Sequence, residues 1–266
     1  MNEHMTKNKT ALITAASGGI GRSIALKLAR EGYHIGVHYH SNREEALRIK
    51  KEAESFGVRA ELFQGDAEEP ERMAAMARDF TACFGRIDVL VNNAGITVLR
   101  SFLDVDEKMM HRLWAADWET PYFVAQEAAR SMIRGRTGGS IINITSVQAK
   151  INFPDASVYG PIKAALVKLT EHLAVELAQY GIRVNAVAPG YINTAHTESA
   201  RAQYIKSRIP LQRLGKGDDV AEMVAFLCSD AGAYITGANI PIDGGMPLPS
   251  SADNYYTPRV VTDKLG

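Results

Sequence analysis

The chain has 266 residues, and its 30 lysines and arginines balance its 30 aspartates and glutamates. This length suffices for one large α/β domain with a substantial core. The absence of net positive charge argues against binding to nucleic acid or to an anionic membrane. The two cysteines, Cys83 and Cys228, lie far apart without a CxxC neighbour, so neither a disulfide framework nor a zinc site is indicated.

Short β-branched runs alternate with long helical patterns along the chain. Strands are expected at 11–14, 34–39, 60–64, 87–92, 140–145, 182–188 and 238–242, and helices at 20–30, 43–55, 71–84, 107–134, 159–180 and 218–229. Several strands are apolar throughout, as is typical where helices cover both faces of a parallel sheet. The pattern predicts a single doubly wound α/β domain of the Rossmann type, with a seven-stranded parallel sheet flanked by helices.

The N-terminal apolar segment and the longest apolar runs bear on localisation. The segment at 11–14 runs directly into a glycine turn and is far shorter than a signal segment, so we interpret it as the first strand. No apolar run approaches the ~18 residues of a membrane span. We therefore expect a cytoplasmic protein with no membrane partner.

Two segments interrupt the alternation. Residues 190–216 form a long insertion after the sixth strand, at the carboxyl edge of the sheet, where insertions commonly cover a ligand. Residues 247–266 carry no periodic pattern, and we interpret them as a tail, with an arm that contacts a neighbouring subunit as the alternative. The expected organisation is a dinucleotide-binding and catalytic domain over 1–246, followed by this segment.

A glycine-rich turn, TAASGGIG at 14–21, lies between the first strand and the first helix. In this context Gly19 and Gly21 let the backbone approach a pyrophosphate, and the helix N-terminus supplies amides and a positive dipole. Such a turn is weak evidence alone, because many α/β proteins use one for packing. An NNAG run at 92–95 in the same chain strengthens it.

Ser146, Tyr159 and Lys163 form a candidate catalytic group. Tyr159 and Lys163 are four residues apart, so on a helix they share a face with about 5–6 Å between their Cβ atoms. An ammonium at that distance favours phenolate over phenol, which lets a tyrosine give or take a proton near neutral pH. Ser146 ends an apolar run and can donate a hydrogen bond to a substrate oxygen. These residues indicate a hydride-transfer enzyme.

With these motifs in this order, and with VNAVAPGYINT at 184–194 and ITGANIPIDGG at 235–245, the chain resembles the short-chain dehydrogenase/reductase family over residues 8–246. Within it, the chain looks most similar to β-ketoacyl-acyl-carrier-protein reductases and related sugar or polyol dehydrogenases. The resemblance implies hydride transfer between NADP(H) or NAD(H) and a carbonyl or secondary alcohol, of the 3-oxoacyl thioester, sugar or cyclic ketone class. It also implies a homotetramer or homodimer.

The resemblance further implies residue roles. Ser146, Tyr159 and Lys163 are catalytic, and Asp117 stands where the family has an asparagine that holds a relay water. The cofactor-binding positions that it implies, with Tyr159 and Lys163, are Ala15, Ser17, Gly18, Gly19, Ile20, Gly21, His38, His40, Ser41, Asn42, Asp66, Ala67, Asn93, Ala94, Gly95, Pro189, Gly190 and Ile192.

Several positions depart from the family pattern. Ala15 replaces the first glycine; we expect a negative φ there, with slight crowding of the phosphate turn. Asp117 adds a negative charge whose effect depends on its burial. Gly18 stands where NADP-dependent members often have a basic residue, and Ile162 fills the serine position of the usual YxxSK.

Cofactor choice depends on HYHSNR at 38–43, which has no carboxylate before Glu44. An acidic residue there would bind the ribose diol and repel a 2′-phosphate. Ser41, Asn42 and Arg43 instead offer donors and one positive charge, and pteridine reductases, which use NADPH, look similar here. We expect NADP(H) over NAD(H), the alternative being that Arg43 simply begins a solvated helix.

Two histidines and a row of aromatic residues allow only less specific predictions. His38 and His40 alternate, but two imidazoles are too few for a zinc site, so we expect cofactor contact or surface exposure and no metal. Trp114, Trp118 and Tyr122 recur at helical spacing, on a helix that pairs across a dimer axis in the family. The alternative to an enzyme is a non-catalytic dinucleotide-binding sensor or scaffold, against which the intact Ser146, Tyr159 and Lys163 argue.

Overall fold

The computed structural model describes residues 9–193 and 200–248. Seven parallel strands form one sheet in the order β3-β2-β1-β4-β5-β6-β7. The strands are β1 (Thr10–Ile13), β2 (His34–Tyr39), β3 (Ala60–Gln64), β4 (Val89–Asn92), β5 (Gly139–Ile144), β6 (Ile182–Pro189) and β7 (Asn239–Ile242). The predicted doubly wound α/β sheet is confirmed, and the strand boundaries differ from expectation by at most two residues.

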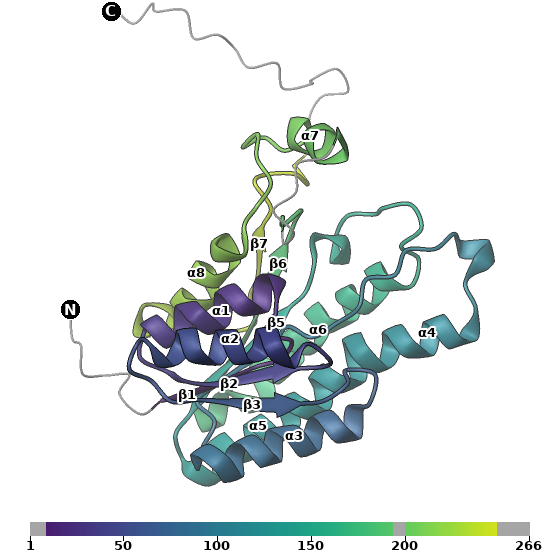
Figure 1. Ribbon diagram of the computed structural model, residues 1–266. Coiled ribbons are helices and arrows are strands. Elements are labelled where there is room, and N and C mark those ends of the chain that lie inside the picture. The colour runs from purple at the N-terminus through teal and green to yellow at the C-terminus, as the bar shows by residue number, and fades with distance from the viewer. Residues whose placement is uncertain (1–8, 194–199, 249–266) are drawn as a thin grey trace, which may run out of the picture.

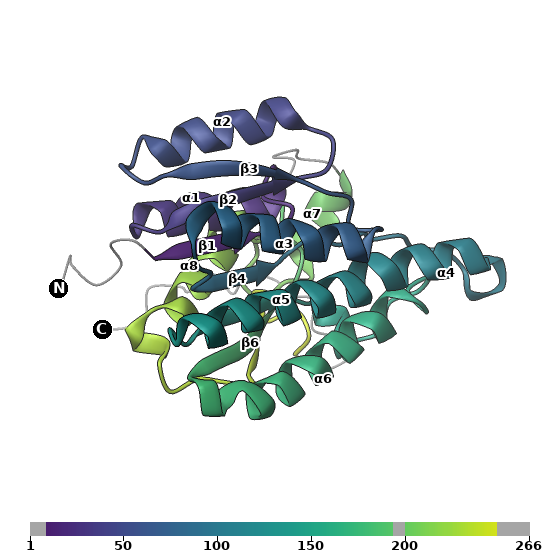
Figure 2. The ribbon, with the colours of Figure 1, turned by 90° about the horizontal axis from the view of Figure 1, so that it is seen from below.

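Helices cover both faces of the sheet, as Figures 1 and 2 show. The helices are α1 (Gly19–Arg30), α2 (Arg43–Glu54), α3 (Pro70–Phe84), α4 (Glu107–Trp114), α5 (Thr120–Gly135), α6 (Tyr159–Leu177), α7 (Ala200–Ser207) and α8 (Gly217–Cys228). One face carries α1, α2 and α8, and the other carries α3, α5 and α6.

The core consists of two main apolar layers, one on each face. Along β1 the side chains alternate, so that Ala11 and Ile13 pack toward α1 while Leu12 packs with Phe80 of α3. All four residues of β1 are buried. This double burial explains why Ala11, Leu12 and Ile13 are all apolar.

The strand order reverses between β1 and β4. From β1 the chain proceeds outward through β2 and β3, then returns to β4 on the other side of β1. In open α/β sheets the crevice at the carboxyl ends of the strands flanking this reversal is where ligands bind. The glycine turn after β1 and the NNAG run after β4 therefore meet there.

The helix expected at 107–134 is divided. A π-helical turn at Ala115–Glu119 separates α4 from α5, and it contains Asp117. Pro121 provides the physical reason, because it lacks an amide hydrogen and in a regular α-helix its ring would collide with the carbonyl of Asp117. Such turns occur frequently at functional sites.

The insertion at 190–216 includes a bridge between Ile192 and Gly215 and the helix α7, which lies beyond the ends of β6 and β7 (Figure 1). Residues 194–199 and 249–266 lie outside the described residues, so the prediction of a C-terminal tail or arm remains a prediction. None of the helices within 9–193 and 200–248 has the length and apolarity needed to cross a membrane.

Candidate active site

A cavity of about 670 Å³ lies at the carboxyl ends of β4, β5 and β6. Its walls include Ser146, Tyr159, Lys163 and Asp117, so all four predicted catalytic residues face one space. Of the predicted cofactor positions outside this group, six also line it: Ile20, Asn93, Gly95, Pro189, Gly190 and Ile192. Residues from opposite ends of the chain thus converge on one cavity.

Ser146 directly follows β5 and is buried with an extended backbone. Its Oγ accepts a hydrogen bond from the amide of Gln148 at 3.1 Å. Because a hydroxyl both accepts and donates, this contact orients the oxygen and leaves its proton for a substrate oxygen.

Tyr159 and Lys163 occupy the first turns of α6 and are both buried. The Lys163 Nζ lies 5.6 Å from the centroid of the Tyr159 ring and donates to the carbonyl of Ile144 at 3.3 Å. The helical spacing therefore places the ammonium beside the phenol, as the sequence predicts.

Asp117 forms a buried ion pair with Lys163. Its Oδ1 lies 2.8 Å from Nζ, and its Oδ2 accepts the amide of Ile96 at 2.9 Å. Burial by itself lowers the pKa of the Lys163 ammonium, but the negative charge of Asp117, supported by the Tyr159 oxygen, outweighs it and raises the pKa above its usual value. The lysine is therefore held in its charged form.

Gly95 makes this ion pair sterically possible. A Cβ at this position would collide with the Asp117 carboxylate and lie 3.4 Å from the Lys163 Nζ. The glycine of the NNAG run thus serves the catalytic end of the site as well as the loop itself.

Ala15 has a left-handed backbone with φ of 49°, so the expected negative φ is wrong. The turn requires this conformation because Asn93, from the loop after β4, fixes it with side-chain hydrogen bonds from Nδ2 to the carbonyls of Thr14 (3.0 Å) and Ala15 (3.2 Å). A Cβ on Gly21 would collide with the Ala15 carbonyl. The turn therefore has little freedom to relax.

His38 supports this turn from beneath. Its Nδ1 accepts the amide of Ala15 at 2.8 Å, and its Nε2 lies 3.1 Å from the carbonyl of Gly65. The residue is only 2% exposed, and burial lowers its pKa to about 4. The imidazole is thus neutral, with its proton on Nε2, and not at the surface; contact between His38 and a cofactor stays a prediction.

The residues after β2 are exposed. The Oδ1 of Asn42 accepts the amide of Glu45 at 3.1 Å and caps α2, and the His40 Nε2 lies 3.4 Å from the Asp66 Oδ2. Ser41 and Arg43 are exposed beside them. Within the described residues, no group of three or more His, Cys, Asp or Glu could hold a metal ion.

The glycine turn has the features that a dinucleotide requires. Helix α1 begins at Gly19 with no side-chain cap from Gly18, so its first amides remain available to an anion. An added Cβ on Gly18 would meet nothing within 4 Å, which shows open space beside the turn. A pyrophosphate fits this combination of free donors and space.

The predicted positions that do not line the cavity belong mainly to the turn and the β2 and β3 loops. They are Ala15, Ser17, Gly18, Gly19, Gly21, His38, His40, Ser41, Asn42, Asp66, Ala67 and Ala94. Ala94 donates its amide to the Thr14 Oγ1 at 2.8 Å, and the Ala67 carbonyl accepts from the Thr120 Oγ1 at 2.7 Å.

Several residues of the cavity wall were not predicted from the sequence. Unpredicted lining residues include Thr97, Leu99, Gln148, Phe153, Asp155, Tyr191 and Met246. Gln148 had a usable signal, because it lies two residues after Ser146. The others are contributed by loops whose positions depend on the tertiary fold.

Comparisons with known proteins agree with this geometry. Residues 14–247 match the family described as Enoyl-(Acyl carrier protein) reductase. The chain is 39% identical to a 3-oxoacyl-acyl-carrier-protein reductase of Staphylococcus aureus over 91% of this chain and 99% of that protein. It is 36% identical to an L-rhamnose 1-dehydrogenase (NAD(P)(+)) of Sphingomonas, covering 91% and 97%. The crystal structure of an acetoin dehydrogenase from Salmonella typhimurium superposes with a TM-score of 0.87 at 39% identity, covering 94% and 99%.

Proposed function

The chain belongs to the short-chain dehydrogenase/reductase family, whose members are NAD(P)(H)-dependent oxidoreductases of carbonyl and alcohol groups, and from this premise we propose that it is an NADP(H)-dependent carbonyl reductase, or the alcohol dehydrogenase of the reverse reaction. The observation that carries the proposal is the convergence of Ser146, Tyr159 and the charged Lys163 on one cavity. We assign the whole activity to residues 1–246.

The roles follow from the contacts. A bound nicotinamide supplies or accepts the hydride at the substrate carbon. Tyr159 gives its phenolic proton to the carbonyl oxygen in reduction and takes it back in oxidation, while Ser146 donates a hydrogen bond to the same oxygen. Lys163 keeps a positive charge beside the Tyr159 ring, which stabilises the phenolate. Asp117 holds that ammonium in place.

Preference for NADP(H) is supported by the loop after β2. No carboxylate lies among the exposed residues His40 to Arg43, and the donors of Ser41 and the positive charge of Arg43 suit a 2′-phosphate. The Asn42 side chain is engaged in capping α2, which leaves Ser41 as the residue best placed to test the preference.

An oligomer is also part of the proposal. Trp114, Trp118 and Tyr122 form a row of adjoining rings, with centroids 5.5 Å and 6.5 Å apart. Trp114 and Tyr122 remain 41% and 38% exposed in the single chain. A homodimer or homotetramer that covers this row would remove the exposed aromatic surface from water.

Replacing Tyr159 with Phe tests the chemistry. The ring remains but the transferable proton is lost, so we expect kcat to fall by on the order of 10²–10⁴-fold with NADPH affinity retained. Tyr180→Phe, at an exposed site beyond the far end of α6, is the matched control and should behave like the wild type. Turnover near the wild-type level in Tyr159→Phe would remove Tyr159 from this role.

Replacing Ser41 with Asp tests the cofactor. A carboxylate at this exposed position should repel a 2′-phosphate and shift the kcat/KM ratio toward NADH, whereas the uncharged Ser41→Asn should leave the ratio nearly unchanged. The measurement is kcat/KM for both cofactors with one carbonyl substrate. Wild-type protein that already prefers NADH contradicts the cofactor assignment.

A further inference from the structure

The side-chain amide of Gln148 is a polar group of the catalytic cavity that no other described residue pairs, whereas Asp117 is held by its ion pair with Lys163. The Oε1 of this amide is buried and has no hydrogen-bond partner, although Gln148 lines the cavity. A ligand that donates a hydrogen bond pairs with this acceptor, whereas an apolar ligand that excludes water from it leaves it unpaired. The amide therefore points to a ligand with a donor.

The position of Gln148 relative to the reacting atoms is fixed by its backbone. Its amide nitrogen donates to the Ser146 Oγ at 3.1 Å, so its side chain begins beside the atom that binds the substrate oxygen. A substrate group that contacts the Gln148 side-chain amide must therefore be attached close to the reacting carbon. A hydroxyl fits best, because it both donates and accepts and so satisfies either end of an amide.

The charge of the cavity limits the substrate further. The charged residues among its described walls are Asp117, Lys163 and Asp155. Asp117 and Lys163 neutralise each other in their ion pair, and Asp155, an exposed residue, adds a negative charge at the edge of the cavity. An anionic group near this wall would be repelled, whereas a hydroxyl could donate to it.

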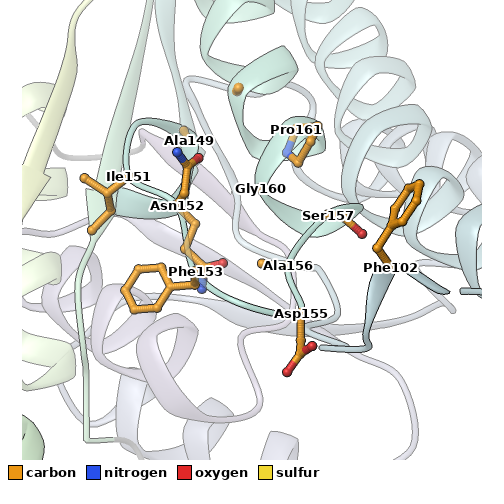
Figure 3. Close-up of a pocket in the computed structure, with 12 residues that line it drawn as sticks. Phe102, Ala149, Ile151, Asn152, Phe153, Asp155, Ala156, Ser157, Gly160 and Pro161 are labelled. Carbon is orange, nitrogen blue, oxygen red and sulfur yellow. The ribbon is translucent and has the colours of Figure 1, made fainter. Parts of the chain in front are cut away.

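A second space adjoins the catalytic cavity. It has a volume of about 430 Å³ and shares Gln148, Phe153 and Asp155 with the first. Figure 3 shows Phe153 and Phe102 on opposite sides of this pocket, with Asp155 at one end and Pro161 at the other. The substituent of a substrate held at Gln148 can extend into this space.

We propose that Gln148 forms a hydroxyl-binding subsite with Asp155 at its exposed edge, so that the preferred substrate is an uncharged ketone with a hydroxyl on the neighbouring carbon, or the matching vicinal diol. This rests on the proposed function and specifies its substrate class. Short acyclic hydroxyketones and sugars share this chemistry.

The test is a substrate series with wild-type, full-length protein and both cofactors. The series is butanone, acetoin, the methyl ether of acetoin, and acetoacetate, with L-rhamnose as the sugar in the oxidative direction. We expect kcat/KM for acetoin to exceed that for butanone by about 10–100-fold, because the analogue without the hydroxyl leaves the amide unpaired. The ether, which cannot donate, and the anionic acetoacetate should both be poor. With 2,3-butanediol measured beside L-rhamnose in the same oxidative direction, the compound with the higher kcat/KM identifies the source of the hydroxyl.

Gln148→Met, which keeps the size of the side chain but not its amide, should reduce the ratio of acetoin to butanone to near one. The ratio is the readout, so any loss common to both substrates cancels. Gln179→Met, the same substitution at an exposed site beyond the end of α6, is the control and should retain the wild-type ratio.

Equal wild-type kcat/KM for acetoin and butanone, or for acetoin and its ether, would overturn the subsite while leaving the carbonyl reductase intact. Efficient turnover of acetoacetate would overturn the role of Asp155. Absence of turnover with every carbonyl and alcohol would instead overturn the proposed function, and the subsite with it.

Discussion

Two departures from the family pattern lie on either side of the strand reversal, and each is compensated by a partner from another element. Asp117, in the π turn between α4 and α5, pairs with Lys163 of α6. Ala15, after β1, donates a backbone amide hydrogen bond to the side chain of His38 of β2. The first pair is charged and the second is neutral. The buried Asp117 is thus paired by charge, and the partly buried Ala15 by a neutral hydrogen bond.

The two pairs differ in what removal of one partner leaves behind. Without Asp117, the buried ammonium of Lys163 has no counter-charge, which is among the most expensive single defects in a protein. Without the His38 imidazole, the Ala15 amide loses one acceptor, which costs about as much as one hydrogen bond. We therefore expect the larger effects at the charged pair.

The largest expected effect is that of Asp117→Leu. Loss of the counter-charge should lower the free energy of unfolding by about 3–5 kcal/mol and reduce kcat strongly, with little change in cofactor affinity. Urea unfolding, steady-state kinetics and NADPH titration measure the three quantities. A Leu variant that is less stable but keeps the wild-type kcat across the pH range would make Asp117 a purely structural residue.

Asp117→Asn is the matched variant, because its side-chain oxygen can still accept the amide of Ile96. We expect neutral-pH activity to be preserved or raised and stability to fall less than in the Leu variant. Removing the anion leaves the charge of Lys163 uncompensated beside Tyr159, so in alcohol oxidation, where Tyr159 accepts the proton, the acidic limb of the kcat/KM profile should move to lower pH. An unmoved limb would show that the Asp117 charge does not act on the proton transfer.

The neutral pair of Ala15 and His38 should make the largest contribution to the loss of folding stability in acid. Because burial lowers the pKa of His38 from 6.5 to about 4, its stabilising contribution is complete above about pH 6.5 and is lost as the pH falls toward 4. The full difference between the two pKa values corresponds to about 3 kcal/mol in the free energy of unfolding. The pH dependence of unfolding should be flatter in His38→Asn, which retains an acceptor.

His34→Asn is the control for this measurement, since His34 also accepts a backbone amide, that of Arg59, but at a partly exposed position. It should keep the wild-type slope. The interpretation fails if both variants lose stability in acid as steeply as the wild type.

The smallest expected effect is that of Ala15→Gly. A left-handed alanine is strained by about 1–2 kcal/mol, and replacing it with glycine removes this strain. Part of the resulting gain in stability is lost, because glycine has more conformational freedom in the unfolded chain. The variant should be more stable by about 0.5–1 kcal/mol in urea unfolding. Ala16→Gly, at a buried neighbour without positive φ, should instead be less stable, and a loss of stability in both would refute strain at Ala15.

Local sequence pattern was sufficient for the architecture. Apolar runs such as that of β5 and the long helical pattern of α6 carry their periodicity within a few residues, so seven parallel strands and the shared face of Tyr159 and Lys163 followed directly. The exact boundaries of the elements, and the division of the segment that contains α4 and α5, could not be predicted in this way. Whether Pro121 interrupts the helix depends on how the surrounding residues pack, which local sequence does not show.

The sequence by itself identified the residues that we propose carry the chemistry and predicted that they lie at the carboxyl edge of a doubly wound sheet. Only the tertiary structure decided that Ala15 is left-handed, that His38 is buried, that Asp117 contacts Lys163, and that Gln148 faces the cavity. Each of these depends on groups brought together from separate elements. Burial and charge pairing are properties of that assembly, and no local periodicity records them.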